Sequence, residues 1–188
     1  MTDHKRNLWI LFFTLVVVML GFGIIIPIMP FYVTSFGASG STLGLLMATY
    51  GTMQFIFAPI WGTLSDRFGR KRILLLGVLG NLLSQLILGF SSQLWMLFAA
   101  RITSGVLSSA TLPTAMAFAG DSTGDRDRSG AMGLLGAAMS VGMVLGPGLG
   151  GLLAGRSLST PFFLAAGLSA IAFVLVLAVL PESLPLER

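Results

Sequence analysis

The sequence predicts an all-α polytopic membrane protein with six transmembrane helices, and three observations lead to that prediction. Of the 188 residues, 55% are hydrophobic and only 10% are charged, whereas a soluble domain carries about 25% charged residues. No charge lies between Leu8 and Ser65, and Arg101 is the only one between Ile73 and Gly120. The apolar runs are continuous, not alternating, which favours helices over a β-barrel; only these two forms satisfy every backbone polar group in lipid.

A hydrocarbon core about 30 Å thick needs roughly 20 helical residues for each crossing, and this length sets the first three spans. The first, near 8–33, is about twice as long as a signal-peptide core, and no cleavage pattern follows it, so we expect it to be retained. The second, near 43–64, follows the turn-forming residues 37–41. The third, near 73–91, follows a cluster of charges and ends in two serines.

The same criterion sets the last three spans. The fourth, near 95–119, begins at a tryptophan and contains Arg101. The fifth, near 130–154, follows a charged loop, and the sixth, near 161–180, begins at a proline after a second polar joint. We therefore expect 1–188 to form a single six-helix transmembrane bundle.

Similar residues recur between the two halves of the chain at an offset of about 89 positions. Gly44, Pro59 and Gly62 in the second span correspond to Gly133, Pro147 and Gly151 in the fifth. Spans one and four also match, and we expect their prolines to break both helices; the residues concerned are Gly23 with Pro27, and Gly105 with Pro113. Transporters are often built from inverted three-helix repeats, and this pattern predicts two of them.

The basic residues predict the orientation of the bundle. With six spans, both termini lie on the same side of the membrane. That side holds Lys5, Arg6, Arg67, Arg70, Lys71, Arg72, Arg126, Arg128 and Arg188. The other side holds only Arg156. Cytoplasmic loops are rich in Lys and Arg, so we expect cytoplasmic termini and a location in the plasma (cytoplasmic) membrane. The basic residues are scattered and have no interleaved aromatic side chains, which argues against a nucleic-acid surface.

Composition also argues against an enzyme. The only histidine, His4, lies in the N-terminal tail, and the chain contains no cysteine, so neither a Ser–His pair nor a thiolate metal site is expected. Every acid lies in a tail or a cytoplasmic loop; these are Asp3, Asp66, Asp121, Asp125, Asp127, Glu182 and Glu187. No intramembrane aspartyl dyad, metal site or cofactor is therefore expected.

Four motifs, in order along the chain, resemble those of the major facilitator superfamily. The first lies between spans two and three and comprises Gly62, Asp66, Arg67, Gly69, Arg70 and Lys71. The second is Arg101 with Gly105, and the third is Asp121, Arg128 and Gly133. The fourth is a glycine-proline motif associated with antiporters, formed by Gly142, Gly146, Pro147, Gly150 and Gly151. The first span, with Gly21, Gly23, Pro27 and Pro30, is similar to the start of twelve-helix drug:proton antiporters of the norfloxacin-efflux type.

This resemblance implies the N-terminal half of a secondary transporter that works by alternating access. It implies proton-coupled efflux of lipophilic drugs or small metabolites, with a proton gradient in place of a cofactor. The partners would be the lipid bilayer, a small-molecule substrate and a second six-helix half, in the same polypeptide or in a homodimer. The alternatives are a non-transporting or self-associating six-helix scaffold and, within transport, the export of sugars or metabolites.

Two charged positions have a physical interpretation of their own. Asp66 could accept two hydrogen bonds from Arg70 across a tight turn at Gly69, forming a latch on the cytoplasmic side; the alternative is that the cluster only fixes topology and binds anionic lipid. Arg101 is costly within a span. It either lines a cavity, on one helical face with Gly105 and Ser108, or extends its side chain to the outer surface. The resemblance implies a role in proton coupling.

The remaining candidates concern packing and substrate. Gly142, Gly146 and Gly150 form a smooth stripe for close helix packing, to which the resemblance adds a seal against ion leak. Aromatic and polar side chains suit an apolar, promiscuous substrate cavity, although such stripes also occur on lipid-facing surfaces. The candidates for that cavity are Phe22, Tyr32, Tyr50, Gln54 and Ser108.

Overall fold

The computed structural model describes residues 3–124, 127–155 and 157–183, and the regular structure in these ranges is helical. The helices are α1 (Asp3–Ser35), α2 (Gly40–Phe68), α3 (Arg70–Gly89), α4 (Leu94–Leu107), the 3-10 turn η1 (Ser108–Ala110), α5 (Thr111–Ser122), α6 (Arg128–Ala154) and α7 (Thr160–Val179). Six segments are long and apolar enough to cross a membrane, because α4, η1 and α5 together form one of them. The prediction of six membrane-length helices is therefore confirmed.

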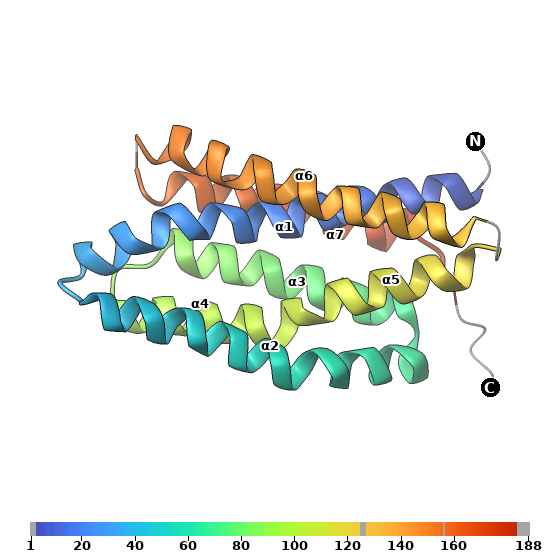
Figure 1. Ribbon diagram of the computed structural model, residues 1–188, viewed down its shortest axis with the longest axis horizontal. Coiled ribbons are helices and arrows are strands. Elements are labelled where there is room, and N and C mark those ends of the chain that lie inside the picture. Colours follow the sequence, from blue (N-terminus) through green and yellow to red (C-terminus); the bar gives the residue numbers. More distant parts are fainter. Residues whose placement is uncertain (1–2, 125–126, 156, 184–188) are drawn as a thin grey trace.

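The helices form an elongated bundle in which the chain alternates direction (Figure 1). The connections after α1, α3 and α6 lie at one end. Those after α2 and α5 lie at the other, together with the start of α1 and the end of α7. The described Lys and Arg residues outside the spans therefore share one end, which we call the basic end. Arg126, Arg156, Arg188, Asp125 and Glu187 lie outside the described residues.

Packing in the bundle is centred on α1 and α3. Helix α1 lies against α6 and α7, whereas α3 lies against α4 and α7. Apolar side chains of α1, among them Leu15, Ile24 and Ile28, are almost fully buried between these neighbours. A helix that is apolar on all sides is buried when other helices surround it, and α1 has this position in the bundle.

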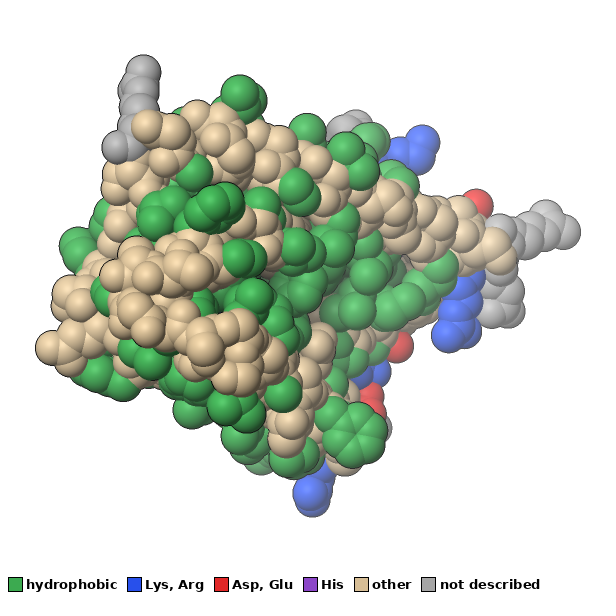
Figure 2. Space-filling view, turned by 60° about the vertical axis from the view of Figure 1, so that its left-hand side comes forward, with side chains coloured by type: hydrophobic (Ala, Val, Ile, Leu, Met, Phe, Trp, Pro, Cys, Tyr) green, Lys and Arg blue, Asp and Glu red, His purple; other side chains and the backbone are tan. Residues whose placement is uncertain are grey.

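Helices α2 and α6 are much less covered. Only Leu46 and Ser65 of α2 are buried, and large apolar side chains such as Phe55 and Val144 face outward. The space-filling view shows hydrophobic side chains over the body of the molecule and charged ones gathered toward one end (Figure 2). The body of the bundle is therefore suited to lipid or to further helices.

The two predicted helix breaks turn out differently. Helix α1 continues through Pro27 and Pro30, so the expected break in the first span is wrong. The fourth span does break, at η1, shortly before Pro113. Neighbouring helices tolerate a proline in a membrane helix by satisfying the freed backbone groups or by local 3-10 adjustment. Helix α1, which other helices surround, remains a continuous α-helix. The fourth span instead contains a 3-10 turn between α4 and α5.

Candidate functional site

A sharp turn at Gly69 joins α2 to α3 at the basic end. Its φ of 101° lies in the left-handed region, which residues with a side chain rarely adopt. Helix α2 ends just before this turn and α3 begins just after it, so Asp66 and Arg70 face each other across it. The turn therefore brings a carboxylate and a guanidinium together, as the spacing predicts.

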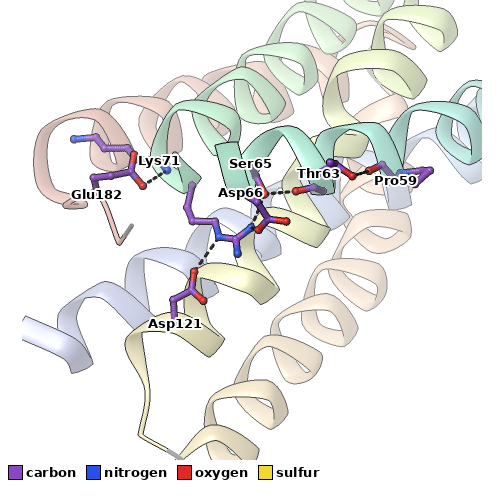
Figure 3. A network of polar contacts seen from close by, with 9 residues as sticks. Pro59, Thr63, Ser65, Asp66, Lys71, Asp121 and Glu182 are labelled. Atoms are coloured by element: carbon purple, nitrogen blue, oxygen red, sulfur yellow. Dashed lines mark hydrogen bonds and ion pairs between the residues drawn. The ribbon is translucent and has the colours of Figure 1, made fainter. Parts of the chain in front are cut away.

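Arg70 binds more than Asp66. Its Nη1 lies 2.5 Å from Asp66 Oδ1 and donates to Ser65 Oγ at 2.7 Å, while its Nε donates to Asp121 Oδ2 at 2.9 Å (Figure 3). The Arg70 side chain is only 10% exposed. In place of the two expected hydrogen bonds to Asp66, Arg70 forms an ion pair with it, and the guanidinium joins three helix ends, those of α2, α3 and α5.

Other residues of these motifs lie outside this cluster. Arg67 is exposed, and a Cβ atom at Gly62 or Gly133 would have no neighbour within 4 Å. Arg128 lies near Gly120, at the end of α5. The structure therefore brings Asp66, Gly69, Arg70 and Asp121 together, whereas Arg67, Arg128 and Gly133 are exposed.

Glu182 is a neighbour of this cluster that sequence reasoning missed. Its Oε1 accepts a hydrogen bond from the backbone N–H of Lys71 at 3.3 Å (Figure 3). Its carboxylate also lies against Gly69. No acidic residue lies in the first turn of α3, so Glu182 supplies the negative charge that a helix N-terminus favours. The sequence holds one signal for such a partner, because the first turn of α3 contains no acidic residue of its own.

Arg101 is fully buried and does not reach the outer surface. Its guanidinium lies over the ring of Tyr50, 5.2 Å from the centroid, and Nη2 lies 3.1 Å from the sulfur of Met47. Its Nε and Nη1 have no hydrogen-bond partner among the described residues. Both contacts come from α2, so Arg101 joins α4 to α2, and two of its three guanidinium nitrogens stay unpartnered in the described part of the chain.

Glycines allow the close helix contacts around these charges. A Cβ at Gly105 would lie 2.5 Å from Met53 Cβ, so α4 touches α2 here. On α6, Gly142 and Gly146 press against the backbone of α1, and Gly150 lies at ordinary contact distance from it. Gly151 points into open space, and Pro147 contacts α1 near Gly23. The predicted glycine stripe is thus the α1–α6 interface.

Four of the five candidates for a substrate cavity line one small cavity of about 30 Å³: Phe22, Tyr50, Gln54 and Ser108. Tyr32 lies elsewhere and is buried, with its hydroxyl 2.8 Å from Ser159 Oγ and 3.3 Å from the carbonyl of Leu88. It ties α1 to the start of α7 and to the end of α3. A larger apolar cavity of about 290 Å³ adjoins the first and shares Phe22, Tyr50 and Gln54 with it.

Comparison with known proteins decides the family. The family model described as Major Facilitator Superfamily matches residues 11–188. The chain belongs to the Major Facilitator Superfamily. It is 39% identical over 186 residues to Multidrug resistance protein 2 of Bacillus subtilis (strain 168), covering 99% of this chain and 46% of that protein. It is 41% identical over 161 residues to the class B tetracycline resistance protein of Escherichia coli, covering 84% and 40%.

The solved structures agree with this assignment. The crystal structure of the human organic anion transporter MFSD10 (TETRAN) superposes with a TM-score of 0.85 at 26% identity, covering 100% of this chain and 50% of that one. The fold is therefore half of a Major Facilitator Superfamily fold. The chain spans about half the length of the curated relatives it matches.

Membership places this integral membrane protein in a family of transporters, which are not enzymes. Among the described residues, no three His, Asp or Glu side chains lie close enough to hold a metal ion. Two arginines of this Major Facilitator Superfamily chain make the charged contacts described above. Arg70 is paired with acids at the basic end, and Arg101 is buried against Tyr50.

Proposed function

We propose that this chain is the N-terminal half of a proton-coupled efflux transporter for lipophilic compounds that works by alternating access. The observation that carries the proposal is the sharing of Arg70 between Asp66 and Asp121, because this contact ties α2, α3 and α5 together at one end of the bundle. An interaction present in one of two arrangements of the helices biases the equilibrium between them. The names of the relatives, for multidrug and tetracycline resistance, suggest the substrate class.

Membrane orientation follows from the charges in this proposal. The basic end faces the cytoplasm, both termini are cytoplasmic, and the protein resides in the plasma membrane. The gate formed by Asp66, Gly69, Arg70 and Asp121 then closes the cytoplasmic side. Arg101 lies buried behind Tyr50, which lines both cavities, and takes part in proton coupling.

Coupling to protons requires a second six-helix half. No carboxylate lies in the membrane part of the described residues, and among the same residues two guanidinium nitrogens of the buried Arg101 have no hydrogen-bond partner. An isolated buried charge is expensive, so a counter-charge from outside this bundle would stabilise it. The outward faces of α2 and α6 are the surfaces on which the second half, supplied by the same polypeptide or by a second copy, would lie.

Dye transport into inverted membrane vesicles tests this function. With the second half present, a proton gradient should drive ethidium uptake, and a protonophore should abolish it. Vesicles holding this six-helix chain alone should show no exchange. Proton-driven ethidium uptake by the chain alone would contradict the requirement for a second half, and uptake of sugars in place of lipophilic dyes would favour the export of metabolites.

A self-associating, non-transporting scaffold is the second candidate, and the large uncovered faces of α2 and α6 favour it. The reading frame distinguishes the two. Continuation beyond Arg188 into six further spans with intramembrane acids would support the transporter. A stop codon at that point, combined with the absence of transport, would support the scaffold.

A further inference from the structure

Many hydroxyl groups within the spans hydrogen-bond to a carbonyl of their own helix. Thr14 donates to the carbonyl of Ile10, and Thr49, Thr103 and Ser169 likewise donate four residues back. Burying a hydroxyl without a partner is unfavourable, and this back-bonding is the local solution that a helix offers. Exceptions to it therefore mark places where another partner is expected.

Several exceptions line the small polar cavity. The hydroxyls of Ser104, Ser108, Thr111 and Tyr50 and the amide of Gln54 have no hydrogen-bond partner within the part of the chain that is described. Thr111 is only 1% exposed, and its hydroxyl oxygen is inaccessible to bulk solvent. These groups come from two different membrane spans, the second and the fourth, so a single ligand in the cavity could satisfy several of them.

The break in the fourth span creates this cavity. A side chain at Gly77 would collide with Thr111, and one at Gly80 would collide with Leu107, so the two glycines let η1 approach α3 closely. Asn81, on the next position of α3, lines the cavity and donates its Nδ2 hydrogen to Ser169 Oγ at 2.9 Å. The amide oxygen of Asn81 remains available as an acceptor.

An apolar compartment lies beside the polar one. The cavity of about 290 Å³ has lining residues in common with the polar cavity, including Phe22, Tyr50 and Gln54, and adds Met139 and Met143 from α6. Tyr50 and Gln54 therefore stand at the border between a polar and an apolar space. Flexible thioethers and an aromatic ring adapt to apolar bodies of different shapes.

We propose that the polar cavity is a hydrogen-bonding subsite for one uncharged hydroxyl, phenol or amide group of a ligand whose apolar body lies in the adjoining cavity. This inference rests on the proposed function and deepens it. The cavity of about 30 Å³ has room for a group of that size, since a water molecule needs about 10–15 Å³ on this measure. No carboxylate lines it to pair with an ammonium group, and Tyr50 covers the guanidinium of Arg101.

The test compares two fluorescent dyes that differ by one hydroxyl group, Nile red and 2-hydroxy-Nile red, binding to the purified chain in detergent. We expect the wild type to bind the hydroxylated dye about three- to tenfold more tightly, the effect of one neutral hydrogen bond. Thr111→Val and Ser108→Ala should reduce this ratio toward one without changing the Kd of Nile red. Ser140→Ala is the matched control, because its hydroxyl is exposed and bonds to the carbonyl of Gly136.

Each result decides between the possibilities. Equal affinities of the wild type for both dyes, or a ratio that survives both substitutions, would overturn the subsite while leaving the proposed transport of lipophilic compounds intact. Failure to bind either dye would also overturn it, and the vesicle assay then decides the function separately. If Thr111→Val does not fold, Ser104→Ala provides a smaller change at the same cavity.

Discussion

Single residues at the basic end carry unequal weight. Arg70 is nearly buried and contacts two acids and one serine, whereas Arg67 and Arg72 are exposed. A guanidinium offers five donors in a fixed fork, and this geometry allows one side chain to serve two carboxylates at once. Lysine at this position would carry the charge without the fork. The network therefore depends on the shape of Arg70 as well as on its charge.

Removing either carboxylate should disable the gate. We expect Asp66→Asn and Asp121→Asn each to lower ethidium transport by at least about tenfold, because each removes a negative charge that pairs with the guanidinium of Arg70 and leaves only an uncharged amide in its place. Insertion and expression should survive, since both side chains are partly exposed. Asp127→Asn, an exposed change at the start of α6, is the control and should transport normally. Unchanged transport in Asp66→Asn would remove the latch.

Arg101 requires its planar group as well as its charge. The guanidinium lies over Tyr50 and beside the Met47 sulfur, a position that a lysine ammonium cannot reproduce in both respects. We expect Arg101→Lys to lose transport at normal expression, measured by dye efflux and by immunoblot of the membranes. The exposed Arg72→Lys should remain active. Wild-type efflux in Arg101→Lys would show that a positive charge alone suffices.

The sequence identifies some of these residues but not their partners. The pair Asp66 and Arg70 is predictable because the two are four residues apart across a glycine turn. Glu182 is separated from Lys71 by most of the chain, and only the packing of α7 on α3 brings the two together. Tyr32 is predicted to line the cavity, but its hydroxyl instead contacts Ser159, which is far from it in sequence.

Among the helices, the same residue type leads to different results. Pro27 lies in an unbroken α1, whereas a 3-10 turn precedes Pro113 in the fourth span. Length and hydropathy predict the six helices because lipid admits few other structures. They do not predict which proline interrupts its helix, because that depends on the neighbours that each helix gains in the folded bundle.

The α1–α6 interface should be the element contact most sensitive to added volume. Gly146 touches Gly23 of α1, so Gly146→Leu should overpack this contact and cost about 1–3 kcal/mol, seen as a lower midpoint of thermal unfolding in detergent. Gly148→Leu is the matched control, because a side chain there would point into open space. Equal midpoints for the two variants would mean that α1 and α6 separate easily.

If the α1–α6 contact also acts as a seal against ions, Gly146→Leu should raise the proton leak across the membrane. A normal proton leak in this variant would contradict the seal.

At the scale of the whole molecule, charge and burial are distributed along different axes. Charged side chains gather toward one end of the molecule (Figure 2), whereas uncovered apolar surface lies on the sides of the bundle, most of all along α2 and α6. Charged side chains at an end suit contact with water there, and apolar side chains along the sides suit contact with lipid or with other helices. Both agree with half of a Major Facilitator Superfamily fold, and the charge distribution sets the expected orientation.

Orientation can be tested directly, because the chain contains no cysteine and single substitutions need no prior removal of thiols. Ser92 lies in the connection after α3, and Ser129 lies at the start of α6, at the basic end; both are exposed. If the basic end is cytoplasmic, a membrane-impermeant maleimide should label Ser92→Cys in intact cells and Ser129→Cys only after permeabilisation. The opposite pattern would invert the orientation and place the Arg70 gate on the outer side. Labelling of both variants in intact cells would mean that the basic residues do not fix one topology, and the gate could then no longer be assigned to one side of the membrane.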